Sequence, residues 1–292
     1  MSDVLRVTVI GAGTMGHGIA QVAAAAGYEV SLHDVSEKLI RKGIESIRAN
    51  LDQGIVKGKV SSELRDGILS RIHPAPGLEV AASQAELVIE AVPESMEMKK
   101  EVFRRLGESA PADAILATNT SALPVGEIAS AARRPERVVG MHFFNPVHLM
   151  PLLEVIRAER TSPRALARAV EAGRRMGKEP IVVNDSPGFA TSRLGVVIGL
   201  EAMRMLEQGV ATAEDIDRAM TLGYRHPMGP LRLSDVVGLD VRLAIAEHLH
   251  RSLGSEAFRP PEILRRLVAE GKLGKKTGEG FYRWDAPGRG TE

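Results

Sequence analysis

The sequence predicts an open α/β domain followed by a smaller all-helical domain. Two observations support this. A G-x-G-x-x-G run follows a β-rich segment near the N-terminus, and short apolar segments ending in polar residues recur through the first half of the chain. After the turn signal DSPGF (185–189) the β-rich pattern stops and helical patterns replace it. We therefore expect domains at residues 1–185 and 186–292.

The first element is the stretch LRVTVIGAGTMGHGIAQVAAAAGYEVSLHD. A β-rich run ends at Gly11, an alanine-rich helix is capped by Gly27, and a second strand ends at Asp34. Gly11 permits a tight turn, Gly13 lets the backbone approach a pyrophosphate, and Gly16 lets the helix pack close to the strand. This order predicts a Rossmann-type nucleotide-binding domain whose loop binds NAD through Gly11, Ala12, Gly13, Thr14, Met15 and Gly16.

Asp34 favours NAD over NADP. It falls about 20 residues after the glycine loop, where a carboxylate can accept hydrogen bonds from both hydroxyls of the adenosine ribose. The same charge would repel a 2′-phosphate. The nearest following arginine, Arg41, lies a helical stretch away and is expected in solvent.

Residues 36–73 are rich in lysine and arginine with helical periodicity. Such charge runs usually form solvated surfaces, so one reading is a solvated helix pair. The other reading is a basic arm that holds a polyanionic substrate. The sequence leaves both open.

Three further segments resemble buried parallel strands: ELVIEAVPE (86–94), AILATNTS (114–121) and RVVGMHFFN (137–145). In open α/β sheets, ligands bind beyond the carboxyl ends of the strands. Polar side chains gather at or just past these predicted ends, namely Glu94, Asn119, Ser121, His142 and Asn145.

The run HFFNPVHLMPLLEVI (142–156) has His142 near one end and Glu154 near the other. Pro146 and Pro151 make a continuous helix improbable, so the chain can turn and bring the two together. A histidine held by a buried carboxylate suits general acid–base chemistry near neutral pH. For an isolated pair, a purely structural hydrogen bond is the alternative. His17 and His148 are interpreted as structural.

The second half reads as four or five helices. The first, LGVVIGLEAMRMLEQG (194–209), is hydrophobic around most of its circumference, which indicates burial by other helices or by a second chain. We expect a homodimer through the helical domain, with a purely intramolecular core as the alternative.

Composition narrows the class of protein. The 292 residues are 44% hydrophobic with a net charge of +1, which gives no electrostatic reason for a nucleic-acid or membrane partner. The chain has no cysteine, which excludes disulfides and cysteine-based zinc sites, and we predict no metal site. The sequence shows neither a signal peptide nor a membrane-length apolar run, so we expect a cytoplasmic protein.

Six motifs together resemble the L-3-hydroxyacyl-CoA dehydrogenase family in its short, free-standing form, along essentially the whole chain: VIGAGTMGHGIA, VIEAVPE, ATNTSALPV, GMHFFNPVHLMPLLEVI, DSPGFATSRL and GKKTGEGFY. The resemblance implies NAD-dependent interconversion of an (S)-3-hydroxyacyl-CoA, short-chain acyl groups included, and its 3-ketoacyl-CoA. It also implies a homodimer.

The resemblance also implies roles for individual residues. His142 matches the catalytic histidine and Glu154 its acidic partner, while Ser121 and Asn145 match residues near the reacting oxygen and the nicotinamide. Further NAD contacts are implied for Glu94, Lys99 and Lys276. Ser192 stands where relatives usually carry asparagine, a departure that puts acyl preference in question. Within the basic segment, the candidates for substrate contact are Arg48, Lys57 and Lys59.

Two alternatives stay open. A dehydrogenase of a small free hydroxy acid shares the two-domain plan, but the common type relies on a lysine in its helical domain. A non-catalytic NAD-binding protein of the same fold would have no chemical need for the set His142, Glu154, Ser121 and Asn145.

Overall fold

The computed structural model describes residues 6–284, and it confirms the predicted fold class. Internal contacts divide the chain into an α/β unit that ends at Ser186 and a helical unit that begins at Pro187. The division falls inside the DSPGF segment.

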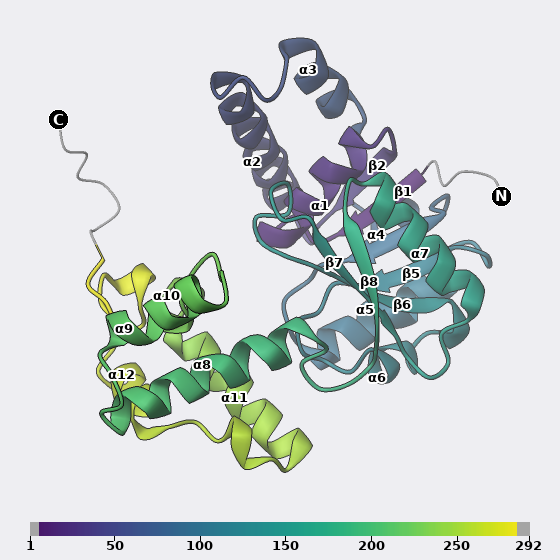
Figure 1. Cartoon of the computed structure of the whole chain (residues 1–292). Helices are drawn as coiled ribbons and strands as arrows, with labels where there is room; N and C mark the ends of the chain where they lie inside the picture. The colour runs from purple at the N-terminus through teal and green to yellow at the C-terminus, as the bar shows by residue number, and fades with distance from the viewer. Residues whose placement is uncertain (1–5, 285–292) are drawn as a thin grey trace. The chain divides into compact units, whose positions relative to one another are not determined.

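The α/β unit is built on one sheet, in which the described residues form eight strands in the order β3-β2-β1-β4-β5-β6-β7-β8 (Figure 1). Neighbouring strands are parallel except for β6 and β7. The first six places follow the order 3-2-1-4-5-6 typical of dinucleotide-binding sheets. The strands are β1 Arg6–Ile10, β2 Glu29–His33, β3 Ile72–Pro74, β4 Leu87–Glu90, β5 Ile115–Thr118, β6 Val138–Phe143, β7 Leu152–Arg157 and β8 Glu179–Asn184.

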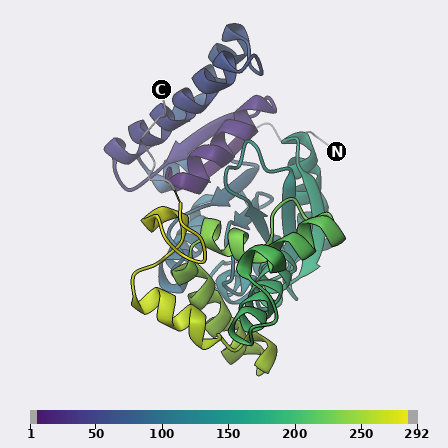
Figure 2. The ribbon, with the colours of Figure 1, turned by 60° about the vertical axis from the view of Figure 1, so that its left-hand side comes forward.

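Helices cover both faces of this sheet, which explains the near-continuous apolar strands (Figure 2). Neighbouring residues of β1 face opposite sides of the sheet. Val9 faces α1, because a Cβ added to Gly16 of α1 would lie 3.6 Å from the Val9 side chain. The neighbouring Thr8 instead donates a hydrogen bond to the carbonyl of Ala81 in α4. The helices of this unit are α1 Thr14–Ala25, α2 Glu37–Val56, α3 Ser62–Ser70, α4 Leu78–Ala82, α5 Met96–Ser109, α6 Val125–Ala129, the short η1 Pro135–Arg137 and α7 Pro163–Arg175.

The basic segment forms the helix pair α2 and α3, which agrees with its helical periodicity and with both readings, and Figure 1 shows the pair extending away from the sheet. Arg65 of α3 contacts Asp52 of α2 at 2.8 Å, which ties the two helices together. The segment then ends in β3, a strand that the sequence analysis did not predict.

The helical unit packs around a core that includes Val196, Leu200, Met203, Leu231 and Leu249. The run LSDVVGLDVRLAIAEHL forms two helices because Gly238 takes a φ of +104°, a conformation that favours glycine. The elements are α8 Thr191–Glu207, α9 Ala213–Arg218, the π turn η2 Ala219–Gly223, α10 Pro230–Val237, α11 Leu239–Leu253, η3 Glu256–Phe258, α12 Glu262–Ala269 and η4 Lys275–Thr277.

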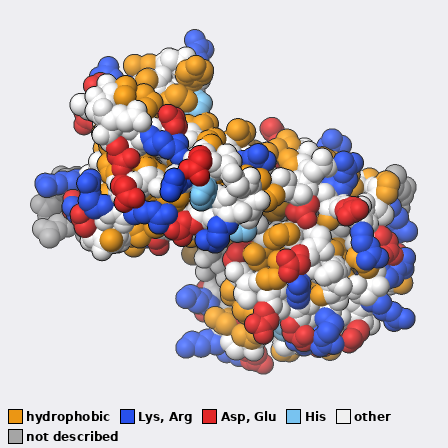
Figure 3. Space-filling model, turned by 90° about the horizontal axis from the view of Figure 1, so that it is seen from below, with side chains coloured by type: hydrophobic (Ala, Val, Ile, Leu, Met, Phe, Trp, Pro, Cys, Tyr) orange, Lys and Arg blue, Asp and Glu red, His pale blue; other side chains and the backbone are white. Residues whose placement is uncertain are grey.

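The surface carries mixed charges. On the face drawn in Figure 3, basic and acidic side chains are interspersed over the α/β unit, as expected from the balanced composition. Within residues 6–284, no helix combines the length and the apolar character that a membrane crossing requires.

Candidate active site

The glycine loop between β1 and α1 contains two glycines that packing requires and one that leaves room for a ligand. A Cβ on Gly16 would lie 1.7 Å from the carbonyl oxygen of Gly11, and a Cβ on Gly11 would lie 2.6 Å from that of Ala91. At Gly13 a Cβ would meet nothing within 4 Å. Gly11 and Gly16 are therefore required by packing, whereas Gly13 borders open space at the start of α1.

Asp34 follows β2 directly and is bonded to the glycine loop. Its Oδ2 accepts a hydrogen bond of 2.8 Å from the amide of Ala12, and its Oδ1 accepts one of 2.7 Å from the amide of Val35. Arg41 pairs with Glu37 at 3.0 Å in solvent, as expected for a residue with no role here.

A pocket of about 880 Å³ runs from this loop along the sheet edge. The first turn of α1 carries no acidic residue, so α1 itself supplies no negative charge to offset the positive end of its dipole beside the pocket. An open Gly13 and a carboxylate at the end of β2 fit a dinucleotide. The pocket is lined by Gly11, Gly13, Thr14, Met15 and Asp34, among others.

His142 and Glu154 meet across the β6–β7 hairpin. The two strands are antiparallel and pair His142 with Glu154 in register, so the turn through Pro146 and Pro151 brings the side chains together. Nδ1 of His142 lies 2.8 Å from Oε2 of Glu154. The carboxylate is fully buried and the imidazole is 8% exposed.

This geometry fixes the chemistry available to the imidazole. A carboxylate oxygen accepts hydrogen bonds, so Nδ1 of His142 is the donor and Nε2 carries the lone pair. Burial of Glu154 strengthens the interaction with an imidazolium, because the local dielectric constant is low. The arrangement can take a proton at Nε2 and return it.

Ser121 is held by Glu94 in the loop that follows β5. Oε1 of Glu94 accepts hydrogen bonds from the amide of Ser121 at 2.9 Å, from its hydroxyl at 3.3 Å and from the hydroxyl of Thr120 at 2.6 Å. In the same loop, Oδ1 of Asn119 accepts a bond of 3.0 Å from the amide of Phe143, the residue after His142. The structure therefore brings the loop after β5 beside the end of β6.

Lys99 is fully buried against Glu90, the last residue of β4. Its Nζ donates to Oε1 of Glu90 at 2.7 Å. Burial raises the pKa of the Glu90 carboxyl, and the Lys99 ammonium opposes that effect. The sequence analysis had not singled out Glu90.

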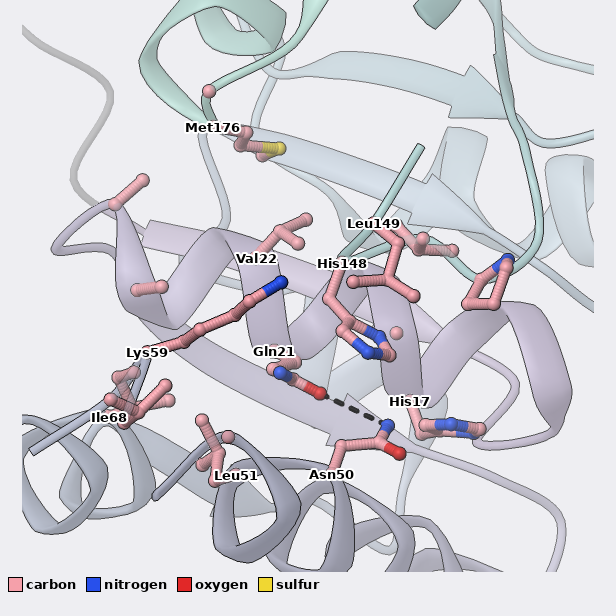
Figure 4. A pocket seen from close by; sticks show the side chains of 18 of the residues that line it. His17, Gln21, Val22, Asn50, Leu51, Lys59, Ile68, His148, Leu149 and Met176 are labelled. Atoms are coloured by element: carbon pink, nitrogen blue, oxygen red, sulfur yellow. Dashed lines mark hydrogen bonds between the residues drawn. The ribbon is translucent and has the colours of Figure 1, made fainter. Parts of the chain in front are cut away.

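A second pocket of about 840 Å³ lies between α1, the α2–α3 pair and the turn after β6 (Figure 4). Asn145 lines it, and His17 and His148 line it too, although the sequence analysis treated both histidines as structural. Among residues 6–284, no Asp or Glu lines this pocket. The cationic or titratable residues that do are His17, Lys57, Lys59, His148, Arg175 and Lys178.

Lys178 and His148 show the positive character of this second pocket. Nζ of Lys178 donates to the carbonyl oxygens of Val147 and Met150, and burial lowers its pKa. Burial, together with the nearby positive charges of His17, Lys178 and Lys57, lowers the pKa of His148. Of the three candidates for substrate contact in the basic segment, Lys57 and Lys59 line the pocket, whereas Arg48 is exposed on α2 and does not.

The helical unit contains the two remaining predicted residues. Nζ of Lys276 lies 2.6 Å from both carboxylate oxygens of Asp240, and this contact lowers the pKa of Asp240. Ser192 lies in the first turn of α8 and is half-buried. The cofactor role of Lys276 and the substrate role of Ser192 remain predictions. Residues 6–284 contain no group of three or more His, Asp or Glu that could hold a metal ion.

A dinucleotide pocket and a buried histidine–carboxylate pair on one nucleotide-binding sheet are features of an oxidoreductase that uses a nicotinamide cofactor. The family models "3-hydroxyacyl-CoA dehydrogenase, NAD binding domain" and "3-hydroxyacyl-CoA dehydrogenase, C-terminal domain" match residues 6–186 and 188–284. The chain belongs to the 3-hydroxyacyl-CoA dehydrogenase family, and its cofactor is NAD.

Three relatives match this chain along their own whole length. A 3-hydroxybutyryl-CoA dehydrogenase of Mycobacterium tuberculosis is 44% identical over 97% of this chain and 100% of that protein. A probable 3-hydroxybutyryl-CoA dehydrogenase of Deinococcus radiodurans is 43% identical over 96% of this chain and 100% of that protein. The crystal structure of (S)-3-hydroxybutyryl-CoA dehydrogenase PaaH1 from Ralstonia eutropha superposes with a TM-score of 0.94 at 37% identity, over 97% of this chain and 100% of that one.

Proposed function

We propose that this protein interconverts short-chain (S)-3-hydroxyacyl-CoA, such as 3-hydroxybutyryl-CoA, and the 3-ketoacyl-CoA, with His142 as the acid/base and Glu154 as its orienting partner. The observation that supports this most is the 2.8 Å contact between Nδ1 of His142 and the buried Glu154, at the carboxyl edge of a dinucleotide-binding sheet. The substrate names of the relatives agree with it.

His142 supplies the proton chemistry of this reaction. In the oxidation, Nε2 takes the proton of the substrate hydroxyl, and Glu154 stabilises the imidazolium through Nδ1. In the reduction, the same imidazolium returns the proton to the ketone oxygen. NAD, when bound, supplies the hydride acceptor for the substrate carbon.

Ser121 and Asn145 complete the proposed site. Glu94 holds Ser121 through its backbone amide, and the Ser121 hydroxyl turns from its longer contact with Glu94 to donate a hydrogen bond to the substrate oxygen. Asn145 lies just past β6, and its amide contacts the nicotinamide end of the cofactor. Glu94 and Lys276 are proposed as cofactor contacts as well.

NADH oxidation measured with acetoacetyl-CoA, with longer 3-ketoacyl-CoAs and with free acetoacetate tests this proposal. We expect turnover with acetoacetyl-CoA and little with the free acid. Comparable rates with free acetoacetate would favour the free hydroxy acid dehydrogenase. No turnover with any of these, despite NADH binding, would favour the non-catalytic alternative.

The acid-free second pocket is proposed to hold the CoA moiety. CoA carries a 3′-phosphate and a pyrophosphate, and lysine and arginine suit both. Thr14 lines both pockets, so the two meet at the N-terminus of α1. Asn145 lines the same pocket, which supports a CoA site that ends near β6.

Charge reversal at Lys57 or Lys59 should weaken binding of the CoA ester. Because exposed charge contacts contribute about 0.2–1 kcal/mol each, we expect KM for acetoacetyl-CoA to rise about two- to fivefold per variant at low salt. The effect should shrink as ionic strength rises. Lys42→Glu, on the exposed surface of α2, is the matched control, and KM for NADH should not change. A larger rise in KM for acetoacetyl-CoA with Arg48→Glu than with Lys59→Glu would contradict a CoA site in this pocket.

Cofactor preference should depend on the charge of Asp34. The Asp34→Asn variant keeps one oxygen that can accept from Ala12, removes the charge and gives up the oxygen that accepts from the amide of Val35. We expect the wild type to prefer NAD, and Asp34→Asn to lower the ratio of kcat/KM for NAD over NADP by about tenfold, which corresponds to about 1.4 kcal/mol. Equal use of both cofactors by the wild type would refute this role.

We propose that the protein is a homodimer through its helical unit. That unit exposes several large apolar side chains, among them Leu194 at 61% and Val210 at 59%. Burying apolar surface of this kind in a second copy would be favourable. Sedimentation velocity on the purified protein tests this proposal. The wild type should sediment as a dimer and Leu194→Glu as a monomer. A monomeric wild type would refute the proposal.

A further inference from the structure

Lys99 lies in a network of protein acceptors. Its side chain is fully buried, and Nζ lies 2.7 Å from Oε1 of Glu90 and 3.1 Å from the carbonyl oxygen of Asn119. The carbonyl oxygen of Val92 at 3.5 Å and Oε2 of Glu94 at 3.6 Å are more distant. The two short contacts tie Lys99 to the ends of β4 and β5.

Glu90 is equally well satisfied. Besides Lys99, its carboxylate accepts a hydrogen bond of 2.7 Å from the amide of Val92 and one of 2.6 Å from the hydroxyl of Thr118. A buried ion pair is weak evidence for stability, because desolvation of both charges opposes their attraction. A fully bonded buried network does, however, hold its members in one arrangement.

Asn119 connects this pair to the end of β6. Its amide donates to the carbonyl oxygen of Glu90 at 2.7 Å, and its own carbonyl oxygen accepts from Lys99. Its side-chain Oδ1 accepts from the amide of Phe143, the residue that follows His142. Asn119 therefore joins the ends of β4, β5 and β6, and Lys99 of α5 holds it from the buried side.

We propose that Lys99, paired with Glu90, is a positioning residue that fixes Asn119 and, through Asn119, the end of β6 that carries His142. The family resemblance implied an NAD contact for Lys99, and the hydrogen bonds to Glu90 and Asn119 add an action on the strand that carries the catalytic histidine. The inference rests on the proposed function, because it assigns Lys99 to the same reaction.

The main test compares variants that remove the pair without leaving a lone buried charge. Glu90→Gln/Lys99→Met replaces both charges by neutral side chains of similar size, and Lys99→Met alone shows the cost of an unpaired Glu90. Lys100→Met is the matched control, because Lys100 is the next residue of α5 and pairs with Glu127 at the surface. We expect the double variant to lower kcat with NADH and acetoacetyl-CoA about 10–100-fold, the usual size of effects from supporting residues, with Kd for NADH nearly unchanged.

A mutant cycle tests the route through Asn119. Asn119→Ala removes the acceptor of the Phe143 amide and should lower kcat by itself. If Lys99 acts through Asn119, adding Asn119→Ala to the double variant should lower kcat little further, because residues that act as one unit give non-additive effects. Multiplied effects would overturn the route.

Other outcomes also decide the matter. A Kd for NADH weakened tenfold or more, with normal kcat at saturation, would make Lys99 a cofactor contact. A lower Tm with normal kcat and Kd would make the pair purely structural.

Amide hydrogen exchange at Phe143 in the double variant, compared with Val139 of the same strand, gives a readout that does not depend on turnover. Faster exchange only at Phe143 supports the inference, and unchanged exchange overturns it. Loss of the proposed function would be recognised separately, because the wild type would then fail with acetoacetyl-CoA.

Discussion

The His142→Ala variant should lose about 10²–10⁴ in kcat, the usual contribution of general acid–base catalysis, while its affinity for NADH stays close to that of the wild type. The physical reason is that Nε2 of His142 is the proposed site of proton transfer. The dinucleotide pocket is lined by other residues. Steady-state rates with NADH and acetoacetyl-CoA, together with NADH binding followed by fluorescence, measure both quantities.

Glu154→Gln should fall between the wild type and His142→Ala. Glutamine can still hydrogen-bond to Nδ1 of His142, but it lacks the charge that stabilises the imidazolium and can hold the ring in the wrong tautomer. The pH profile of kcat should therefore shift along with the rate. Near-normal turnover of His142→Ala would remove the mechanism, and a Glu154→Gln profile identical to that of the wild type would remove the role of Glu154.

Much of the fold could be predicted because its signals are local. The order of strand, glycines, helix, Gly27 and Asp34 lies within one short segment, and each residue type has a backbone or charge requirement that can be read directly. The meeting of His142 and Glu154 could be anticipated because two prolines between them exclude a helix. The hairpin register that pairs them could not, because register depends on the neighbouring strands β5 and β8.

Other features depend on tertiary contacts and left little trace in the sequence. The strand β3 has only three residues, and β8 is an exposed edge strand whose apolar run is limited to Ile181, Val182 and Val183. Lys99 and Lys178 resemble surface lysines in sequence, yet both are buried and bonded to backbone carbonyls. The second pocket draws on segments as distant as α1 and the end of α7, which no local pattern joins.

Gly13→Ala and Gly16→Ala should fail for different reasons. A methyl group at Gly16 would stand 1.7 Å from a backbone oxygen that has no freedom to move aside, so α1 must shift from β1. Overpacking of this kind costs about 1–3 kcal/mol or more, and we expect a lower Tm together with lost NADH binding. At Gly13 the methyl group meets no protein atom within 4 Å, so Tm should not change.

The Gly13 methyl group should instead oppose the cofactor, whose pyrophosphate is expected to approach the backbone there. We take the cost of a methyl group against the pyrophosphate to equal the overpacking cost used for Gly16→Ala, about 1–3 kcal/mol. That cost corresponds to a loss of roughly 5- to 150-fold in NADH affinity. Gly223→Ala is the matched control, because Gly223 has equally open space and lies in the helical unit. Thermal melting and NADH titration of the three variants separate the cases. If Gly13→Ala binds NADH as tightly as the wild type, the pyrophosphate does not approach Gly13. If Gly16→Ala has an unchanged Tm, the glycine loop can move to accommodate the methyl group, which would contradict the prediction for Gly16.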